Sequence, residues 1–161
     1  MRIFITDTGM VPMRPTKSDV IVRDDGNIGV CTGCCACWYK TPGVCVKQDR
    51  LQHLGGLLSK CDELVIVSRC IMGSVSPFVK CVMERMVSYL GPECIKKNGS
   101  YRRKLRYDNI KMKLTVYFYG EDVTEEEKDC ARELIYANAM TLGARPGQVI
   151  FLRDAAEIGG F

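Results

Sequence analysis

The chain has 161 residues, of which 47% are hydrophobic and 26% charged, and its formal net charge is +4 at pH 7. This length corresponds to about one domain, and no apolar run reaches the roughly 18 residues of a membrane-spanning helix. The basic residues are too scattered for a nucleic-acid-binding domain, which usually carries a dense basic stripe and a pI above about 9. Polar residues begin at Thr6, too early for a signal peptide. We therefore expect a single cytoplasmic domain over residues 1–161, with no nucleic-acid or membrane partner.

Two short strands are predicted at the start of the chain. In Arg2–Thr6, Ile3 and Ile5 alternate with the other residues, Arg2, Phe4 and Thr6, and Asp19–Arg23 is rich in β-branched residues. Between them, Pro12 and Pro15 interrupt a stretch without helical periodicity, which predicts a loop. Asp24–Asn27 then has the composition of a turn.

A cysteine-rich loop is expected from Val30 to about Val46. The chain has ten cysteines, and half of them lie in this loop. Clustered cysteines in a chain without a signal peptide more often bind metal or carry out redox chemistry than form structural disulfides. The scattered cysteines are expected to pack as small hydrophobic residues. The clustered ones are Cys31, Cys34, Cys35, Cys37 and Cys45.

The spacing Cys31-x2-Cys34-x2-Cys37-x7-Cys45 places four thiol groups on a compact loop. Four thiolates suit an iron–sulfur cluster or a structural zinc ion. Alternatively, the Cys-x-x-Cys pairs exchange disulfides or react as thiolates, or the thiols are unligated groups in a packed loop. The spacing therefore indicates metal or redox chemistry and leaves these alternatives open.

The middle of the chain is predicted to contain two helices around a central strand. Asp49 is a candidate N-cap for a helix over residues 51–58, whose leucines recur at helical spacing. Glu63–Ser68 is nearly all apolar, as expected of a parallel strand buried on both faces. A helix then begins at Ser76, with apolar positions continuing to Leu90.

The last third of the chain begins with Gly91–Asp108, a basic stretch that we interpret as a long connection because it lacks clear periodicity. Lys113–Tyr119 is predicted to be a strand. Thr124–Leu142 follows as a helix whose start, Thr124 with Glu127, has the pattern of a capping box. Gln148–Leu152 is the last predicted strand.

Strands that alternate with helices indicate an α/β fold with a parallel sheet. Five strands fit the doubly wound, three-layer, flavodoxin-like arrangement, with the strand order 2-1-3-4-5. Right-handed crossovers then place the three helices on one face. The other face lacks helices, because residues 8–18 contain two prolines and only residues 153–161 follow the last strand. We expect this under-covered face to pack on a second copy of the chain in a homodimer.

The segment from Cys31 to Cys45, followed by Asp49, resembles the cysteine loop of the flavodoxin-like NAD(P)H-dependent FMN reductases. It is also similar to the compact motif of the iron–sulfur flavoproteins, where four cysteines hold a four-iron, four-sulfur cluster. The resemblance continues through Asp62–Arg85, which looks like the third strand, flavin loop and following helix of that family, and at Arg106-Tyr107.

This resemblance implies an oxidoreductase or electron-transfer flavoprotein with FMN at the carboxyl ends of the strands. NAD(P)H or a reduced carrier would supply electrons to a small-molecule acceptor or redox carrier, and Cys31, Cys34, Cys37 and Cys45 would hold the iron–sulfur cluster in series with the flavin. The residues expected around FMN are Thr6, Thr8, Gly9, Ser68, Arg69, Cys70, Ile71, Met72, Gly73, Tyr119 and Gly120.

The chain departs from this family pattern after the first strand. Family members have a Ser/Thr/Gly-rich phosphate loop and a helix N-terminus there, whose backbone N–H groups bind the FMN phosphate. Here Met10 and Pro12 follow Gly9, and no helix is predicted. Arg14 or Arg69, or a second subunit, could replace the lost phosphate contacts. The alternative functions are a cofactor-free module that binds a partner or senses oxidants through its thiols, and a zinc-stabilised structural domain.

Overall fold

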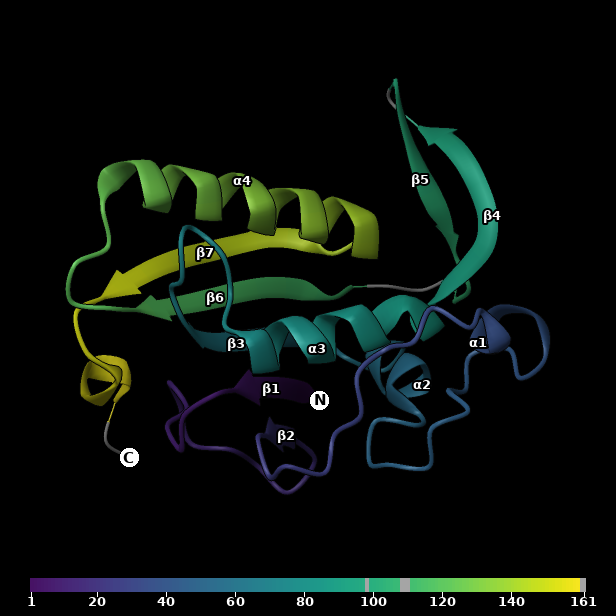
Figure 1. Cartoon of the computed structure of the whole chain (residues 1–161), viewed down its shortest axis with the longest axis horizontal. Coiled ribbons are helices and arrows are strands. Elements are labelled where there is room, and N and C mark those ends of the chain that lie inside the picture. Colours follow the sequence, from purple (N-terminus) through teal and green to yellow (C-terminus); the bar gives the residue numbers. More distant parts are fainter. Residues whose placement is uncertain (98, 108–110, 160–161) are drawn as a thin grey trace.

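The computed structural model describes residues 1–97, 99–107 and 111–159. Its centre is a five-stranded sheet in the order β2-β1-β3-β6-β7, in which all neighbouring strands are parallel (Figure 1). The strands of this sheet are β1 (Arg2–Thr6), β2 (Val20–Arg23), β3 (Glu63–Arg69), β6 (Lys113–Tyr119) and β7 (Arg145–Leu152). Counted among themselves, they follow the order 2-1-3-4-5 that the sequence predicts. The numbering differs because two strands outside this sheet, β4 and β5, come between β3 and β6.

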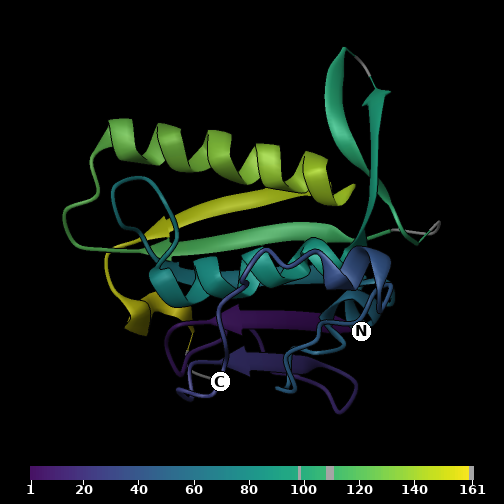
Figure 2. The same ribbon diagram turned by 45° about the vertical axis from the view of Figure 1, so that its right-hand side comes forward.

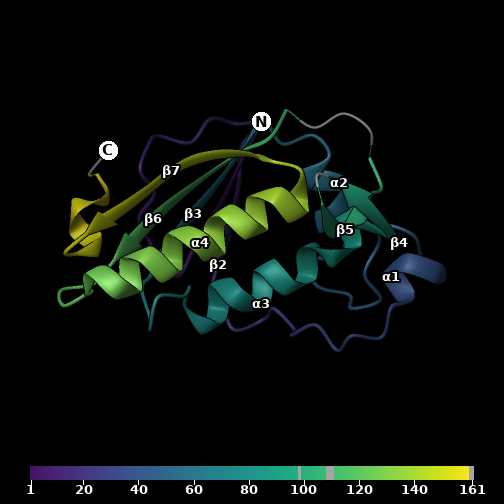
Figure 3. The same ribbon diagram turned by 90° about the horizontal axis from the view of Figure 1, so that it is seen from above.

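Helices of three different lengths cover one face of the sheet. They are α2 (Leu54–Leu58), α3 (Pro77–Arg85) and α4 (Glu125–Leu142). Figure 3 shows α3 and α4 on the same side of the strands. Side chains from all three helices belong to one core cluster with inward-facing residues of the strands, such as Ile5, Ile66 and Val116. None of the helices in the described parts of the chain has the length and hydrophobicity that crossing a membrane requires.

On the opposite face, the described residues form no long helix, and the loop after β1 runs over it instead (Figure 3). Its central apolar residues are nevertheless covered, because Phe4, Val65 and Val67 are all 0% exposed. The Arg2 guanidinium lies 5.3 Å from the centre of the Phe4 ring and also binds the Asp19 carboxylate. The predicted apolar patch at the central strand is therefore not exposed, since the chain's own side chains shield it. The homodimer stays a prediction.

The expected connection over Gly91–Asp108 is wrong for its described part, which forms a hairpin. β4 (Leu90–Lys97) pairs antiparallel with β5 (Ser100–Leu105), and the hairpin projects from the body of the molecule (Figures 1 and 2). Lys97 pairs with Ser100, and in the sequence Asn98-Gly99 stands between these two residues. Asn-Gly is the strongest short-range indication of a hairpin, and it could have been recognised in the sequence. Asp108 lies outside the described residues.

Two predicted helices are shorter than the apolar spacing indicates. α3 ends at Arg85, continues as the 3₁₀ helix η1 (Met86–Tyr89), and Leu90 already belongs to β4. α2 begins at Leu54 rather than near Leu51, and its N-cap residue makes no side-chain cap. Apolar spacing does not distinguish a helix from a helical turn followed by a strand, because both bury the same residues. The predictions for α4 are confirmed, including the capping box of Thr124.

The short helix α2 packs closely on η1, which allows a direct test with two neighbouring glycines. A Cβ on Gly55 would lie 2.8 Å from the Ser88 carbonyl oxygen, whereas one on Gly56 would meet nothing within 4 Å. We predict that Gly55→Ala lowers the free energy of unfolding by about 2 kcal/mol through overpacking. The control Gly56→Ala should leave it unchanged or raise it by up to about 1 kcal/mol, because alanine favours helices. Urea unfolding measures both, and equal effects would contradict the packing that the structure shows.

Candidate functional site

The cysteine loop is held in place by a buried ion pair between Asp49 and Arg85. Two guanidinium nitrogens of Arg85 each donate to one carboxylate oxygen of Asp49 at 2.8 Å. The same carboxylate accepts the backbone N–H groups of Gly29 and Leu51, which lie on either side of the cysteine loop. Asp49 therefore joins both ends of the loop to the end of α3. It is not the N-cap that the sequence predicts for α2.

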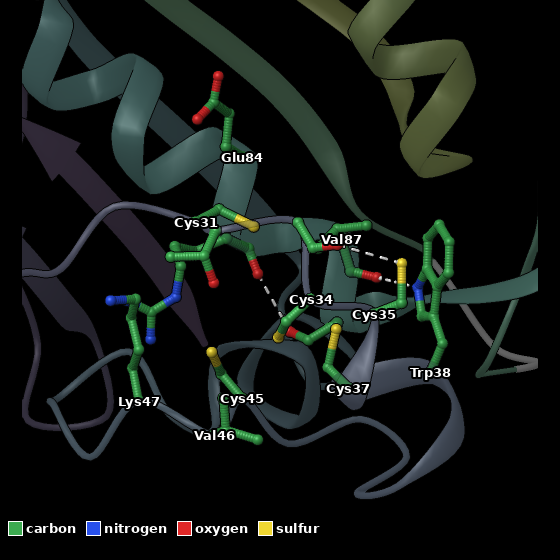
Figure 4. Close-up of a pocket in the computed structure, with 14 residues that line it drawn as sticks. Cys31, Cys34, Cys35, Cys37, Trp38, Cys45, Val46, Lys47, Glu84 and Val87 are labelled. Carbon is green, nitrogen blue, oxygen red and sulfur yellow. Dashed lines mark hydrogen bonds between the residues drawn. The ribbon is translucent and has the colours of Figure 1, made fainter.

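All five clustered cysteines line one cavity of about 350 Å³ at the end of α3. Figure 4 shows the thiols of Cys31, Cys34, Cys37 and Cys45 around this space. Arg85 forms part of its wall, and the Nε–H of this 1% exposed side chain has no hydrogen-bond partner among the described residues. The structure thus brings together the cysteines that the spacing singles out, at the end of α3 that lies away from the carboxyl edge of the sheet (Figure 1).

Aromatic and cationic side chains fix the wall of this cavity. The Trp38 indole N–H donates to the Val87 carbonyl oxygen at 2.9 Å, and the Arg103 guanidinium lies 4.6 Å from the centre of the Trp38 ring. Arg106 donates to the Cys37 carbonyl oxygen at 3.4 Å. The hairpin that contains Arg103 and the residues just after it therefore support the short helix α1 (Ala36–Tyr39).

The thiols of this loop differ in their environment. Cys34 is exposed, and a hydrogen bond from the backbone N–H of Ala36 lowers the pKa of its thiol. Burial raises the pKa of the Cys37 thiol, and the other three thiols of the motif raise it further. Cys35 adopts a left-handed backbone conformation with φ of 56°, which is uncommon for a residue other than glycine. The loop therefore carries both electrostatic and conformational features of a functional site.

The arrangement of the donor groups gives the metal prediction no support. In the described parts of the chain, no three side chains of His, Cys, Asp or Glu gather in a way that could hold a metal ion. All ten cysteines are free. Neither an iron–sulfur cluster nor zinc at Cys31, Cys34, Cys37 and Cys45 is supported, and we derive no chemistry from such a group.

The second candidate site is the carboxyl edge of the sheet, where Asp7 links three strands. One oxygen of its carboxylate accepts the backbone N–H of Arg69 at 2.9 Å, and the other accepts the Tyr119 hydroxyl at 3.2 Å. Burial and the neighbouring Asp7 raise the pKa of Tyr119 to about 12, so its hydroxyl remains a donor at neutral pH. Asp7 directly follows β1, Arg69 ends β3 and Tyr119 ends β6.

The predicted phosphate-binding residues Thr6, Thr8 and Gly9 form a closed loop rather than an anion site. The Thr6 hydroxyl accepts the backbone N–H of Thr8, and the Thr8 hydroxyl accepts that of Met10. The backbone N–H of Asp7 donates to the Val67 carbonyl oxygen. These groups are therefore already paired, and no helix follows to supply others. The FMN phosphate does not fit this loop.

The predicted flavin loop after β3 does present apolar groups at this edge. Ile71 and Ser74 exchange two backbone hydrogen bonds of 2.9 Å, and the two residues between them, Met72 and Gly73, both have positive φ. This is the pattern of a type I′ turn, in which asparagine or glycine is usual and methionine is not. The Met72 side chain is 88% exposed. The predicted ring-binding residues therefore form an exposed apolar turn.

A cleft of about 590 Å³ lies beside this turn and includes Tyr119 and Gly120 at the end of β6. The Cys70 backbone N–H donates to the Tyr119 carbonyl oxygen at 2.9 Å, which joins the two predicted parts of the ring site. Ser68 is buried, and its hydroxyl accepts the N–H of Ser76 at the start of α3, so it serves the turn rather than a ligand. The acidic and basic side chains that line the cleft are those of Arg69, Glu121, Asp122, Glu127, Arg153 and Asp154.

The two candidate sites lie at opposite ends of α3. The carboxyl edge is next to its first residues, and the cysteine cavity is next to Arg85 at its last turn (Figure 1). The expectation that the cysteines and a flavin act in series within one chain is therefore not supported. Sequence reasoning also missed Asp7 as a site residue. Its position, directly after a buried strand at the expected binding edge, could have identified it.

No protein-family model and no curated protein matches the sequence. Solved structures do resemble this chain. An FMN-dependent NADH-azoreductase from Bacillus anthracis str. Ames Ancestor, in complex with FMN, has a TM-score of 0.59 and 12% identity, covering 98% of this chain and 91% of its own. The apo form of the NADH:FMN oxidoreductase EMOB has a TM-score of 0.51 and 9% identity, with coverages of 94% and 74%.

A third similar structure, described as a thermophilic tryptophan halogenase from Streptomycin violaceusniger, has a TM-score of 0.54 and 11% identity, with coverages of 99% and 90%. At these identities the likenesses show the α/β, flavodoxin-like fold alone. Different activities occur among the three descriptions, as expected of a fold that serves many functions. The function of this chain must therefore be argued from its own residues.

The ion pair of Asp49 and Arg85 predicts a stability that depends on pH. Asp49→Asn should lower the free energy of unfolding at pH 7 by about 3 kcal/mol, because it leaves a buried guanidinium without its charge partner. Arg85 lowers the pKa of the Asp49 carboxyl. The stabilisation is therefore complete above the ordinary carboxyl pKa of about 4 and is lost as the pH falls through the lower folded value.

Urea unfolding in the presence of a reductant, from pH 7 to pH 3, measures this difference. The matched control is Asp25→Asn, because the Asp25–Arg50 pair is exposed and should contribute less than about 0.5 kcal/mol. A difference between wild type and Asp49→Asn that stays constant down to pH 3 would contradict the electrostatic interpretation.

Proposed function

We propose that the protein is a flavodoxin-like oxidoreductase that binds a flavin ring at the carboxyl edge of its sheet. NAD(P)H or a reduced carrier would supply the electrons, and a small molecule or redox carrier would accept them. The observation that carries this proposal is Met72, an 88% exposed apolar side chain held at a φ of 50° in the turn after β3. Strained residues of this kind persist mainly where a ligand uses them. Cys70, two residues before Met72, lines the cleft at the ends of β3 and β6.

The location of this turn agrees with the general rule for open α/β sheets. Ligands bind outside the carboxyl ends of the strands, where the strand order reverses. In this sheet the reversal lies between β1 and β3, and β3 is the strand whose last residue, Arg69, lines the cleft. Two of the similar structures are described as enzymes that use FMN or act on it, which supports a flavin over other planar ligands.

The residues at the edge suit the ring of a flavin better than its phosphate. Ile71 and Met72 offer an apolar surface, and the Tyr119 side chain is oriented by its hydrogen bond to Asp7. A bound flavin would supply hydride and single-electron chemistry, while the protein would hold and orient it. Cys70 lines the same cleft, and burial raises the pKa of its thiol, so this neighbour of the ring stays protonated.

A substitution in the turn separates ligand binding from stability. We predict that Met72→Asn raises the free energy of unfolding by about 1 kcal/mol, because asparagine tolerates a left-handed conformation better than methionine. The same change should weaken flavin binding about fivefold through the lost apolar contact. Quenching of flavin fluorescence, with riboflavin and FMN titrated separately, measures binding, and urea unfolding measures stability.

Tyr136→Asn is the control for this prediction, since Tyr136 is an exposed apolar residue in α4. It should leave flavin binding unchanged. If neither flavin binds to the wild-type protein, the proposed function is wrong. If Met72→Asn binds as well as wild type, the turn is not the ring-binding surface.

A second candidate function is thiol redox chemistry in the cysteine cavity. It is favoured by the left-handed conformation of Cys35 and by the exposed Cys34 in a cavity lined by further free thiols. Oxidation of two thiols would form one disulfide and pass two electrons and two protons to hydrogen peroxide, which would become two molecules of water.

We predict that mild peroxide treatment lowers the mass of the protein by two hydrogens and joins Cys34 to another thiol of the cavity. Mass spectrometry after alkylation of the remaining thiols identifies the pair. Cys130, which is exposed on α4, is the internal control and should remain alkylated. Equal oxidation of Cys130 and Cys34 would show that exposure alone decides reactivity.

A further inference from the structure

The place at which a flavin phosphate would be expected contains a carboxylate of the protein itself. Asp7 lies where the strand order reverses, and it accepts the backbone N–H of Arg69 at 2.9 Å and the Tyr119 hydroxyl at 3.2 Å. Anion sites at the carboxyl edge of α/β sheets are built from donors that point to the ligand, above all backbone N–H groups. Here a backbone N–H and a hydroxyl point to Asp7 instead, so we interpret its carboxylate as standing where an anion would bind.

The surroundings of Asp7 add to its effect on an incoming ligand. Four carboxylates and two arginines line the neighbouring cleft, so negative charge is in excess there. The backbone N–H groups of Thr8 and Met10 are bonded within the loop after β1, and that of Asp7 donates to the Val67 carbonyl oxygen of β3. A phosphate at this edge would therefore meet a fixed negative charge, and few free donors would compensate for the repulsion.

We propose that Asp7 selects the class of ligand at the carboxyl edge: the site takes an uncharged ring, a flavin without a phosphate, and rejects phosphorylated flavins such as FMN. This inference rests on the proposed function, because it names the ligand of the same site. In this proposal, the Asp7 carboxylate links the ends of β1, β3 and β6 and occupies the place that the phosphate would take.

A second cavity, lined by two arginines, offers another place where the phosphate of FMN could bind. Arg14 and Arg23 line a space of about 680 Å³ together with residues of the loop after β1 and Gly159. A phosphate held there would give FMN an advantage over riboflavin. The two arrangements therefore predict opposite preferences between two ligands that share the same ring.

The test compares riboflavin with FMN on the full chain by quenching of flavin fluorescence at low salt. We expect wild type to bind riboflavin about tenfold more tightly than FMN, since only FMN brings negative charge toward Asp7. In Asp7→Asn, FMN binding should tighten about tenfold while riboflavin binding changes less than about twofold. Thermal unfolding of the same samples confirms that the variant is folded.

Glu121→Gln is the matched control. Glu121 lines the neighbouring cleft, so this change removes one negative charge nearby and leaves the contacts of Asp7 between the strands intact. It should tighten FMN binding by less than about threefold. An effect equal to that of Asp7→Asn would overturn the special role of Asp7. Tighter binding of FMN than of riboflavin to wild type, abolished by Arg14→Ala or Arg23→Ala, would overturn the inference while leaving the proposed function intact. Binding of neither flavin would overturn both.

Discussion

The carboxylate of Asp49 accepts four hydrogen bonds, two from the Arg85 guanidinium and two from backbone N–H groups at the ends of the cysteine loop. This loop has little regular structure beyond the four-residue helix α1, so its shape depends on such contacts. Arg85 is 1% exposed and ends α3, which packs on the sheet. The position of five cysteines is thus set by one buried ion pair, whose two charges stabilise each other only when both are present.

The same helix α3 separates the two sites. At its start, Ser76 caps the helix, and its backbone N–H donates to the hydroxyl of Ser68 near the end of β3 at 2.8 Å. At its end lies the cysteine cavity. Among the described residues, the non-glycine residues with positive φ are Met72 and Cys35, one at each site. Backbone strain therefore coincides with the two places where exposed reactive or apolar side chains gather, which is where ligands and functional groups are expected.

The carboxyl edge illustrates how a fold can be kept while its ligand preference changes. The sheet order and the exposed turn at Met72 agree with the ring binding that we propose at this edge. However, two hydrogen-bond donors at this edge, the Arg69 N–H and the Tyr119 hydroxyl, already bind the carboxylate of Asp7. Likeness to FMN-dependent enzymes concerns the sheet, whereas the ligand is decided by a few side chains at the strand ends. The fold of the sheet and the ligand preference of its edge need not change together.

The sequence by itself determined the parallel sheet, its strand order and the capping box of α4, because apolar periodicity and local capping need only neighbouring residues. It also identified the cysteines that line one cavity. The tertiary structure alone decided that Asp49 pairs with Arg85 instead of capping α2, and that Asp7 links β1, β3 and β6. These contacts join residues that are 36 to 112 positions apart in the sequence. The energy of a charged group depends on its neighbours and its burial in the folded protein, and the local sequence does not specify either.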